Sequence, residues 1–147
     1  MSSVAPNRLS SRNYPVAATA AQPKRVTPTI LIAEDSRDSR EMLEVLLLLR
    51  GYDVLTAEDG PTALQLALAN VPSLILLDLG LPKLDGLSVA RHLRSYASLT
   101  RVPIVMLSGH DPMEYKQPAL DAGCTDYLLK PLDFRKLDEI LEHEVPL

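Results

Sequence analysis

The residue types that could carry chemistry stand where short apolar runs of the sequence end. They are Glu34, Asp35, Asp78, Ser108 and Lys130. If the runs are parallel strands, their carboxyl ends share one edge of a sheet, and ligands bind at that edge where the strand order reverses. We therefore expect these side chains, which are scattered along the chain, to converge in the folded protein.

Together these side chains match the needs of phosphoryl transfer. Three carboxylates that meet repel one another unless a cation joins them, and an oxygen-rich set of this kind suits Mg²⁺, which keeps waters that a phosphate can displace. Lys130 would supply a positive charge for phosphate oxygens and Ser108 a hydroxyl donor. Asp78 in such surroundings is equipped to act as the nucleophile.

Each of these residues also has a plain structural explanation when it is taken alone. Glu34 and Asp35 could cap the helix that follows, Asp78 could be a loop acid, and Lys130 could be a solvated lysine. These explanations do not account for the conjunction, in which four apolar runs each finish on a residue type that the same reaction needs. The conjunction favours a phosphoryl-accepting site.

The elements that must position these residues follow from the hydrophobic pattern. The apolar runs are 30–33, 53–57, 74–77, 104–107 and 127–129. Most of them are continuously apolar, which is typical of strands that helices cover on both faces. The sequence therefore predicts an α/β fold with a five-stranded parallel sheet.

Helical patterns fill the intervals between the runs. They cover about 38–50, the segment from Gly60, 87–96, 113–122 and 133–144. Gly51 is placed to end the first helix, and Leu137, Ile140 and Leu141 are expected to face inward from the last. Pro118 falls inside the fourth helix and removes a backbone donor, so we expect a kink or a late start there.

A helical wheel of the first helix predicts its buried face. The residues directed toward the sheet are Met42, Val45, Leu46 and Leu49. This arrangement leaves Leu47 and Leu48 on the outer side, beside Glu41 and Glu44.

Length and composition limit the class of protein. At 147 residues, with 46% hydrophobic residues and no Trp, the chain suits one domain with an aliphatic core. No apolar stretch approaches the roughly 20 residues of a membrane-spanning helix, so no membrane association is expected. Cys124 is the single cysteine, which excludes an internal disulfide and suits a reducing cytoplasm.

Residues 1–28 differ in composition from the rest of the chain. They contain four basic residues and no acid, although the whole chain has a net charge of −4. Because Ser, Ala and Pro dominate and no apolar periodicity is present, we interpret 1–28 as a disordered basic tail and 29–147 as the folded domain. A transit peptide is disfavoured because Pro6, Pro15 and Pro23 would break its amphipathic helix.

The chain resembles the receiver domains of two-component response regulators, in particular single-domain receivers of the chemotaxis type. The matching segments are 32–35 (Ile-Ala-Glu-Asp), 77–78 (Leu-Asp), 81–82 (Leu-Pro), 84–86 (Leu-Asp-Gly), 107–109 (Leu-Ser-Gly) and 126–131 (Asp-Tyr-Leu-Leu-Lys-Pro). The resemblance covers about 29–144. It implies a doubly wound, flavodoxin-like sheet with strand order 2-1-3-4-5, the order that chemotaxis receivers exemplify.

The resemblance also implies roles for particular residues. Asp78 would take the phosphoryl group from a histidine kinase or a phosphotransfer protein. The ligands of Mg²⁺ would be Glu34, Asp35, Asp78 and the carbonyl of Gly80. Lys130 would pair with the phosphoryl group across a cis bond to Pro131. Ser108 and Tyr127 would form the switch, although a static role for Tyr127 is an equally good interpretation.

Other function classes remain as alternatives. A hydrolase of the haloacid-dehalogenase type would place its nucleophile on the first strand with a second acid two residues later, whereas Asp78 lies on the third run and has Gly80 two residues later. A receiver-like interaction module acting without phosphate usually lacks the acceptor, the acid pair or the lysine, and all are present here. We expect catalysis only of the chain's own phosphorylation and dephosphorylation.

Expectations about partners follow from the same resemblance. No output domain follows Leu147, so we expect a stand-alone cytoplasmic receiver without nucleic-acid binding, a monomer or weak dimer acting on an unspecified output protein. Because the first helix flanks the mouth where Asp78 would meet a phosphohistidine, Leu47 and Leu48 are candidates for a docking contact. Scattered surface leucines are also common, and that interpretation stays open.

Overall fold

The computed structural model describes residues 26–147, so the predicted tail lies almost entirely outside the described residues. Within 26–147, strands and helices alternate. The strands are β2 (Thr29–Ala33), β3 (Asp53–Ala57), β4 (Leu74–Asp78), β5 (Ile104–Ser108) and β6 (Asp126–Leu129). The helices are α3 (Arg37–Leu49), α4 (Gly60–Asn70), α5 (Gly86–Arg94), α6 (Pro112–Asp121) and α7 (Phe134–Glu144), with a short 3₁₀ turn at Ala97–Leu99.

The strands of the described chain form one parallel sheet. Its order is β3-β2-β4-β5-β6, which is 2-1-3-4-5 when the strands are counted along the chain, as predicted. The register pairs Ala33 of β2 with Leu77 of β4, and Ser108 of β5 with Leu129 of β6. The carboxyl ends of these strands therefore lie close together at one edge.

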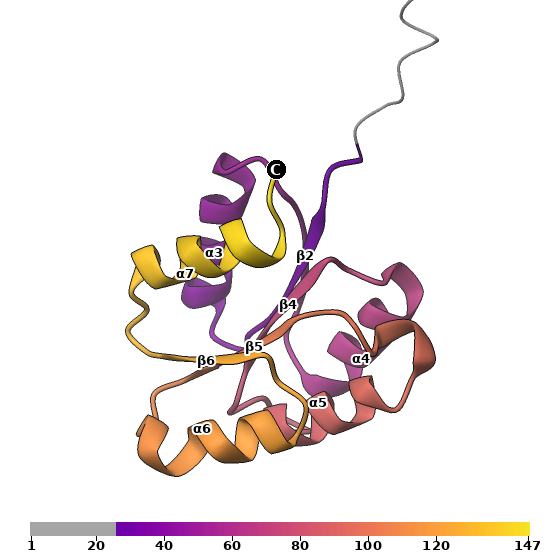
Figure 1. The fold of residues 1–147 in the computed structure, drawn as a ribbon, viewed down its shortest axis with the longest axis vertical. Helices are drawn as coiled ribbons and strands as arrows, with labels where there is room; N and C mark the ends of the chain where they lie inside the picture. Colours follow the sequence, from indigo (N-terminus) through magenta and orange to yellow (C-terminus); the bar gives the residue numbers. More distant parts are fainter. Residues whose placement is uncertain (1–25) are drawn as a thin grey trace, which may run out of the picture.

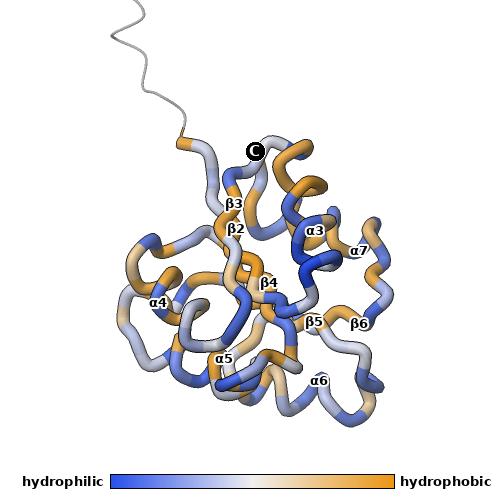
Figure 2. Tube along the Cα trace, turned by 180° about the vertical axis from the view of Figure 1, so that it is seen from behind, coloured by the Kyte–Doolittle hydropathy of each residue, from blue (hydrophilic) through white to orange (hydrophobic). Residues whose placement is uncertain are grey.

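Helices cover both faces of the sheet, with α3 and α7 on one side and α4, α5 and α6 on the other (Figure 1). Side chains of β2 alternate between the two layers: Ile30 and Ile32 pack in the α3/α7 layer, and Leu31 and Ala33 in the opposite one. Hydrophobic residues accordingly concentrate along β2, β3 and β4 (Figure 2). The continuously apolar strands thus fill two cores.

The predicted inward face of the first helix was wrong for three of its four residues; only Leu46 packs, partly buried, against the core. α3 buries Leu43 and Leu47, the latter with no exposed surface, and leaves Met42, Val45 and Leu49 exposed. The cause is the run of consecutive leucines at 46–49, which fits more than one helical face. Packing against Ile30, Ile32 and Leu76 selects the face with a spacing of four residues. Leu47 is therefore a core residue, while Leu48 stays half exposed.

The remaining helices begin and end close to the predicted bounds. Gly51 follows α3 with a left-handed φ of +97°, as a C-terminal glycine should, and Asp59, Asp85 and Asp133 cap the starts of α4, α5 and α7. Of the two outcomes expected at Pro118, a kink or a late start, the late start was wrong, because α6 begins at Pro112 and continues through Pro118.

The structure agrees with the expectation for the residue pair at the end of β6. The bond between Lys130 and Pro131 is cis. Within residues 26–147, none of the helices combines the length and the apolar character that crossing a membrane requires.

Candidate functional site

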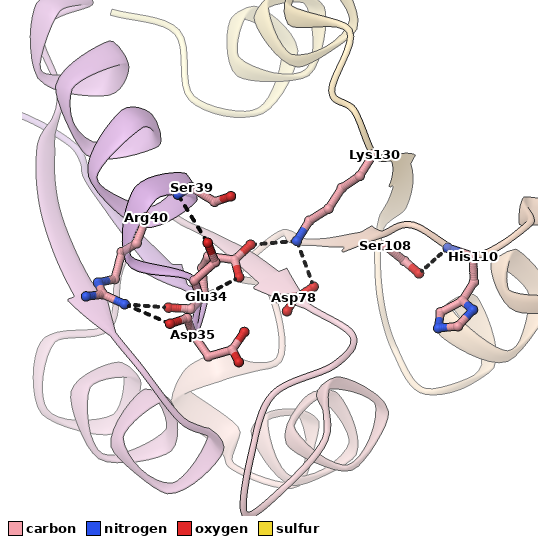
Figure 3. A network of polar contacts seen from close by, with 9 residues as sticks. Glu34, Asp35, Ser39, Arg40, Asp78, Ser108, His110 and Lys130 are labelled. Atoms are coloured by element: carbon pink, nitrogen blue, oxygen red, sulfur yellow. Dashed lines mark hydrogen bonds and ion pairs between the residues drawn. The ribbon is translucent and has the colours of Figure 1, made fainter.

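The acidic residues predicted from the strand ends come together at the carboxyl edge of the sheet. Glu34 and Asp35 follow β2 directly, and Asp78 is the last residue of β4. One carboxylate oxygen from each of the three lies within 4.8 Å of the others. Figure 3 shows the three side chains clustered between the end of β2 and the end of β4. The sheet order places them there, because β2 and β4 are adjacent strands.

Glu34 is the most enclosed of the three acids, with 1% of its surface exposed. Its backbone N–H donates to the carbonyl of Ala57 at 3.0 Å, which extends the pairing of β2 with β3. Its carboxylate accepts from the backbone N–H of Ser36 at 3.1 Å. A buried carboxylate needs a donor such as the Ser36 N–H. Together with the backbone contact to Ala57, this hydrogen bond fixes the position of Glu34 in the cluster.

Lys130 enters the cluster from the end of β6. Its Nζ donates to Oε1 of Glu34 at 2.6 Å and to Oδ1 of Asp78 at 3.1 Å. Burial works to lower the pKa of Lys130, but its hydrogen bonds with these acids and their charges outweigh that effect, so the pKa is raised and the ammonium stays charged. One lysine for three carboxylates leaves an excess of negative charge, which a divalent cation would neutralise.

Ser108 lies at the same edge but is bonded away from the acids. Its Oγ accepts from the backbone N–H of His110 at 2.9 Å, and the residue is buried. The hydroxyl of Tyr127 donates to the carbonyl of the same His110 at 2.8 Å, and the Tyr127 ring is already buried. The backbone of His110 thus links the two residues that the sequence predicted to move together.

Gly80 lies beside the cluster, two residues after Asp78. A Cβ atom built at this position would lie 3.9 Å from Oδ2 of Asp78, with no closer neighbour. The space next to the Asp78 carboxylate is therefore open at position 80.

A cavity of about 520 Å³ adjoins the cluster on the α3 side. Glu34 and Lys130 form its polar wall, and the apolar wall includes Met42 of α3 and Phe134 of α7. Both of these apolar side chains are partly exposed. Apolar surface therefore lies beside Glu34 and Lys130 on this side of the cluster.

Arg40 belongs to this region, although it is not among the residues predicted from the sequence. Its Nη1 donates to the carbonyl of Glu34 at 3.0 Å and to that of Asp35 at 3.4 Å. The available signal was an arginine near the amino end of a helix, where the helix dipole disfavours positive charge and acids are common. An arginine at such a position needs a compensating interaction, and here its hydrogen bonds to the carbonyls at the end of β2 provide one.

Comparison with known families identifies the class. Residues 30–142 match the response regulator receiver domain. The chain belongs to this family. Receiver domains are signalling modules of two-component systems, and phosphorylation on an aspartate together with Mg²⁺ binding is characteristic of them.

Curated relatives share the receiver but are longer. Response regulator MprA of Mycobacterium sp. (strain KMS) is 42% identical over 108 residues, which make up 74% of this chain and 46% of that protein. Response regulator PleD of Caulobacter vibrioides is 36% identical over 104 residues, 71% of this chain and 23% of that protein. The chain therefore spans less than half the length of these relatives.

Solved structures share the fold over most of the chain. The receiver domain of sensor histidine kinase PA1611 from Pseudomonas aeruginosa PAO1, crystallised with a magnesium ion in its active-site cleft, has 33% identity and a TM-score of 0.76, covering 83% of this chain and all (100%) of that one. Chemotaxis protein CheY4 of Vibrio cholerae has 29% identity and a TM-score of 0.76, covering 82% of this chain and 100% of that one.

Proposed function

We propose that the chain accepts a phosphoryl group on Asp78 from a phosphohistidine of a histidine kinase or phosphotransfer protein, and that residues 29–147 form the receiver unit. The observation that carries the proposal is the convergence on Asp78: its Oδ1 lies 3.1 Å from Nζ of Lys130, and its carboxylate lies within 4.8 Å of those of Glu34 and Asp35. Membership of the receiver family supports the same assignment.

In the transfer itself, a carboxylate oxygen of Asp78 attacks the phosphorus. An oxygen–phosphorus bond forms, the phosphorus–nitrogen bond of the phosphohistidine breaks, and the imidazole leaves with the electron pair. Lys130 offsets the negative charge of the phosphoryl oxygens. The Asp78 side chain is only 11% exposed, which limits the access of water to the acyl phosphate.

Glu34, Asp35 and Asp78, with the carbonyl of Gly80, would hold Mg²⁺. The donor set fits, because carboxylate and carbonyl oxygens are the ligands that this ion prefers and the cluster carries more negative charge than Lys130 offsets. The bound ion would supply a second positive charge to the phosphoryl oxygens. The magnesium in the PA1611 receiver is consistent with this arrangement.

The switch would pass through His110. To donate to a phosphoryl oxygen, the Ser108 hydroxyl must turn toward Asp78. This rotation breaks the hydrogen bond that Ser108 Oγ accepts from the His110 N–H. The His110 carbonyl also holds the Tyr127 hydroxyl, so a shift of this backbone would reach Tyr127. Because the Tyr127 ring is already buried, the expected change is a different hydroxyl partner or ring position within the β5–α6 region.

The partner would dock over the cavity beside Lys130. The exposed apolar side chains there and along α3 include Met42, Val45, Leu48, Leu49 and Phe134. An apolar surface next to the acceptor would bury against apolar residues of the helices that carry the phosphohistidine. Of the Leu47–Leu48 pair expected from the sequence, this surface keeps Leu48, whereas Leu47 is buried.

The test is beryllofluoride, which mimics an acyl phosphate, followed by amide NMR of the full chain with and without Mg²⁺. The proposal predicts Mg²⁺-dependent shifts at 34–35, 78–80, 108–110 and 130, with Tyr127 shifting as well. Asp78→Asn is the control, because it removes the oxygen that would bind beryllium and is nearly isosteric. Shifts that persist in this variant, or no shifts at the strand ends, would contradict the proposal.

A further inference from the structure

Arg40 is an arginine that folds back from a helix onto the backbone of the preceding strand. Its side chain is 13% exposed, although it lies in the amino-terminal part of α3, near the protein surface. Nη1 contacts two successive carbonyls, those of Glu34 and Asp35, at 3.0 and 3.4 Å. Figure 3 shows the guanidinium on the opposite side of the acidic pair from Lys130. The two cations thus hold the end of β2 from two directions.

This arrangement has to offset two unfavourable effects. A positive charge near the amino end of a helix opposes the helix dipole. Ordering a long side chain also costs rotamer entropy. Arg37 in the same helical turn behaves like an ordinary surface arginine, since it is 78% exposed and pairs with Glu41. The hydrogen bonds from Arg40 to the two peptide groups must therefore be favourable enough to offset both effects.

Those peptide groups determine where the Asp35 carboxylate lies. The carbonyl of Glu34 belongs to the peptide that precedes Asp35, and the carbonyl of Asp35 belongs to the peptide that follows it. Glu34 has contacts of its own, to Ser36 and Lys130, which fix its side chain. Among residues 26–147, no group donates a hydrogen bond to the Asp35 carboxylate. The origin of this side chain and the direction of its Cα–Cβ bond are therefore set by the backbone alone.

We propose that Arg40 is a positioning residue of the cation site: by holding the two peptide planes around Asp35, it aims the Asp35 carboxylate at Asp78 and Glu34. The inference rests on the proposed function, in which these three acids hold Mg²⁺. Nη2 of Arg40 also lies 3.8 Å from the carboxylate of Glu58. Because that carboxylate is mostly exposed, this ion pair contributes little to the position of the Asp35 backbone.

Positioning and simple charge effects predict opposite signs for the loss of Arg40. A guanidinium near the acids repels a divalent cation, so on electrostatic grounds alone its removal should tighten Mg²⁺ binding. If Arg40 orients a ligand, its removal should weaken binding in spite of the lost repulsion. The direction of the change in affinity therefore distinguishes the two roles.

The experiment is a titration of the full chain with MgCl₂, followed by the amide shifts of residues 34, 35 and 78. Arg40→Ala should raise the Kd for Mg²⁺ about tenfold, the size of effect that is typical when a group supporting a metal ligand is lost. Arg40→Lys should also weaken binding, because it keeps the charge but its shorter side chain has no nitrogen at the position of Nη1, which contacts both carbonyls. Arg37→Ala, with the same charge change in the same turn, should leave the Kd unchanged.

A second readout separates positioning from a general loss of stability. Labelling by acetyl phosphate should need more Mg²⁺ in Arg40→Ala but reach the wild-type rate at saturating Mg²⁺. If Arg40→Ala does not give a dispersed amide spectrum, Arg40→Lys carries the same test. An unchanged or lower Kd in the Arg40 variants, with normal Mg²⁺ binding by the wild type, would overturn the inference and leave the proposed function standing. No Mg²⁺-dependent shifts at the strand ends of the wild type would overturn both.

Discussion

Replacement of Lys130 by Met tests how the acidic cluster is held together without a metal. Lys130→Met removes the ammonium and keeps an unbranched apolar side chain. Two acids then lose their shared cation: Glu34, which is 1% exposed, and Asp78, whose side chain is 11% exposed. Because the pKa of Lys130 is raised, the wild-type contribution is fully present at neutral pH and is lost only as the pH rises through the folded-state pKa.

The expected loss of stability follows from the burial of the acids. Removing one partner of a buried ion pair typically costs about 3–5 kcal/mol. Since 30% of the Lys130 side chain is exposed, water can hydrate part of the site, and we expect the lower end, about 3 kcal/mol. For a domain of this size, that loss corresponds to a decrease in Tm of roughly 12 °C.

The assay is thermal denaturation followed by circular dichroism, in EDTA and in MgCl₂. In EDTA, Lys130→Met should melt well below the wild type. Mg²⁺ should raise the Tm of the variant more than that of the wild type, because the ion then neutralises acids that have no other cation. Lys136→Met, at an exposed position on α7, is the control with the same charge change. Equal Mg²⁺ shifts in the variant and the wild type would show that the ion binds elsewhere.

Three further predictions test the surfaces and the core. Leu47→Ala should cost about 2–5 kcal/mol of unfolding free energy in urea, against about 1 kcal/mol or less for the half-exposed Leu48→Ala; similar losses would contradict the assigned helix face. The double variant Val45→Ala and Leu48→Ala should slow phosphotransfer from the cognate partner but not labelling by acetyl phosphate, and an equal loss in both assays would indicate a folding defect. Burial raises the pKa of Cys124 to about 11, so the folded chain should react slowly with iodoacetamide at pH 8 and quickly in urea; rapid labelling of the folded chain would contradict the burial.

The sheet and the acidic cluster could be predicted because several signals in the sequence agree. Continuously apolar runs indicate strands buried on both faces, and the residue after each run is thereby assigned to one edge. Glu34, Asp35, Asp78 and Lys130 were located in this way, and the structure places them together. Their functional roles stay predictions until the variants are measured.

The face of α3 could not be predicted because its sequence is ambiguous. Leucines at four successive positions fit several helical faces, and only the packing of Leu43 and Leu47 against the strands decides among them. The role of Arg40 was hidden for a different reason. An arginine that folds back onto carbonyls leaves no periodic pattern in the sequence, and neither does the link from Ser108 through the His110 backbone to Tyr127.

The most direct test of the account is covalent labelling of the full chain with acetyl phosphate in the presence of Mg²⁺, measured as the gain of one phosphoryl group by intact-protein mass spectrometry. The account predicts labelling of the wild type, labelling of the surface control Asp121→Asn, and none of Asp78→Asn. It also predicts that EDTA abolishes the label. A label retained by a folded Asp78→Asn variant would contradict the assignment of Asp78 as the acceptor.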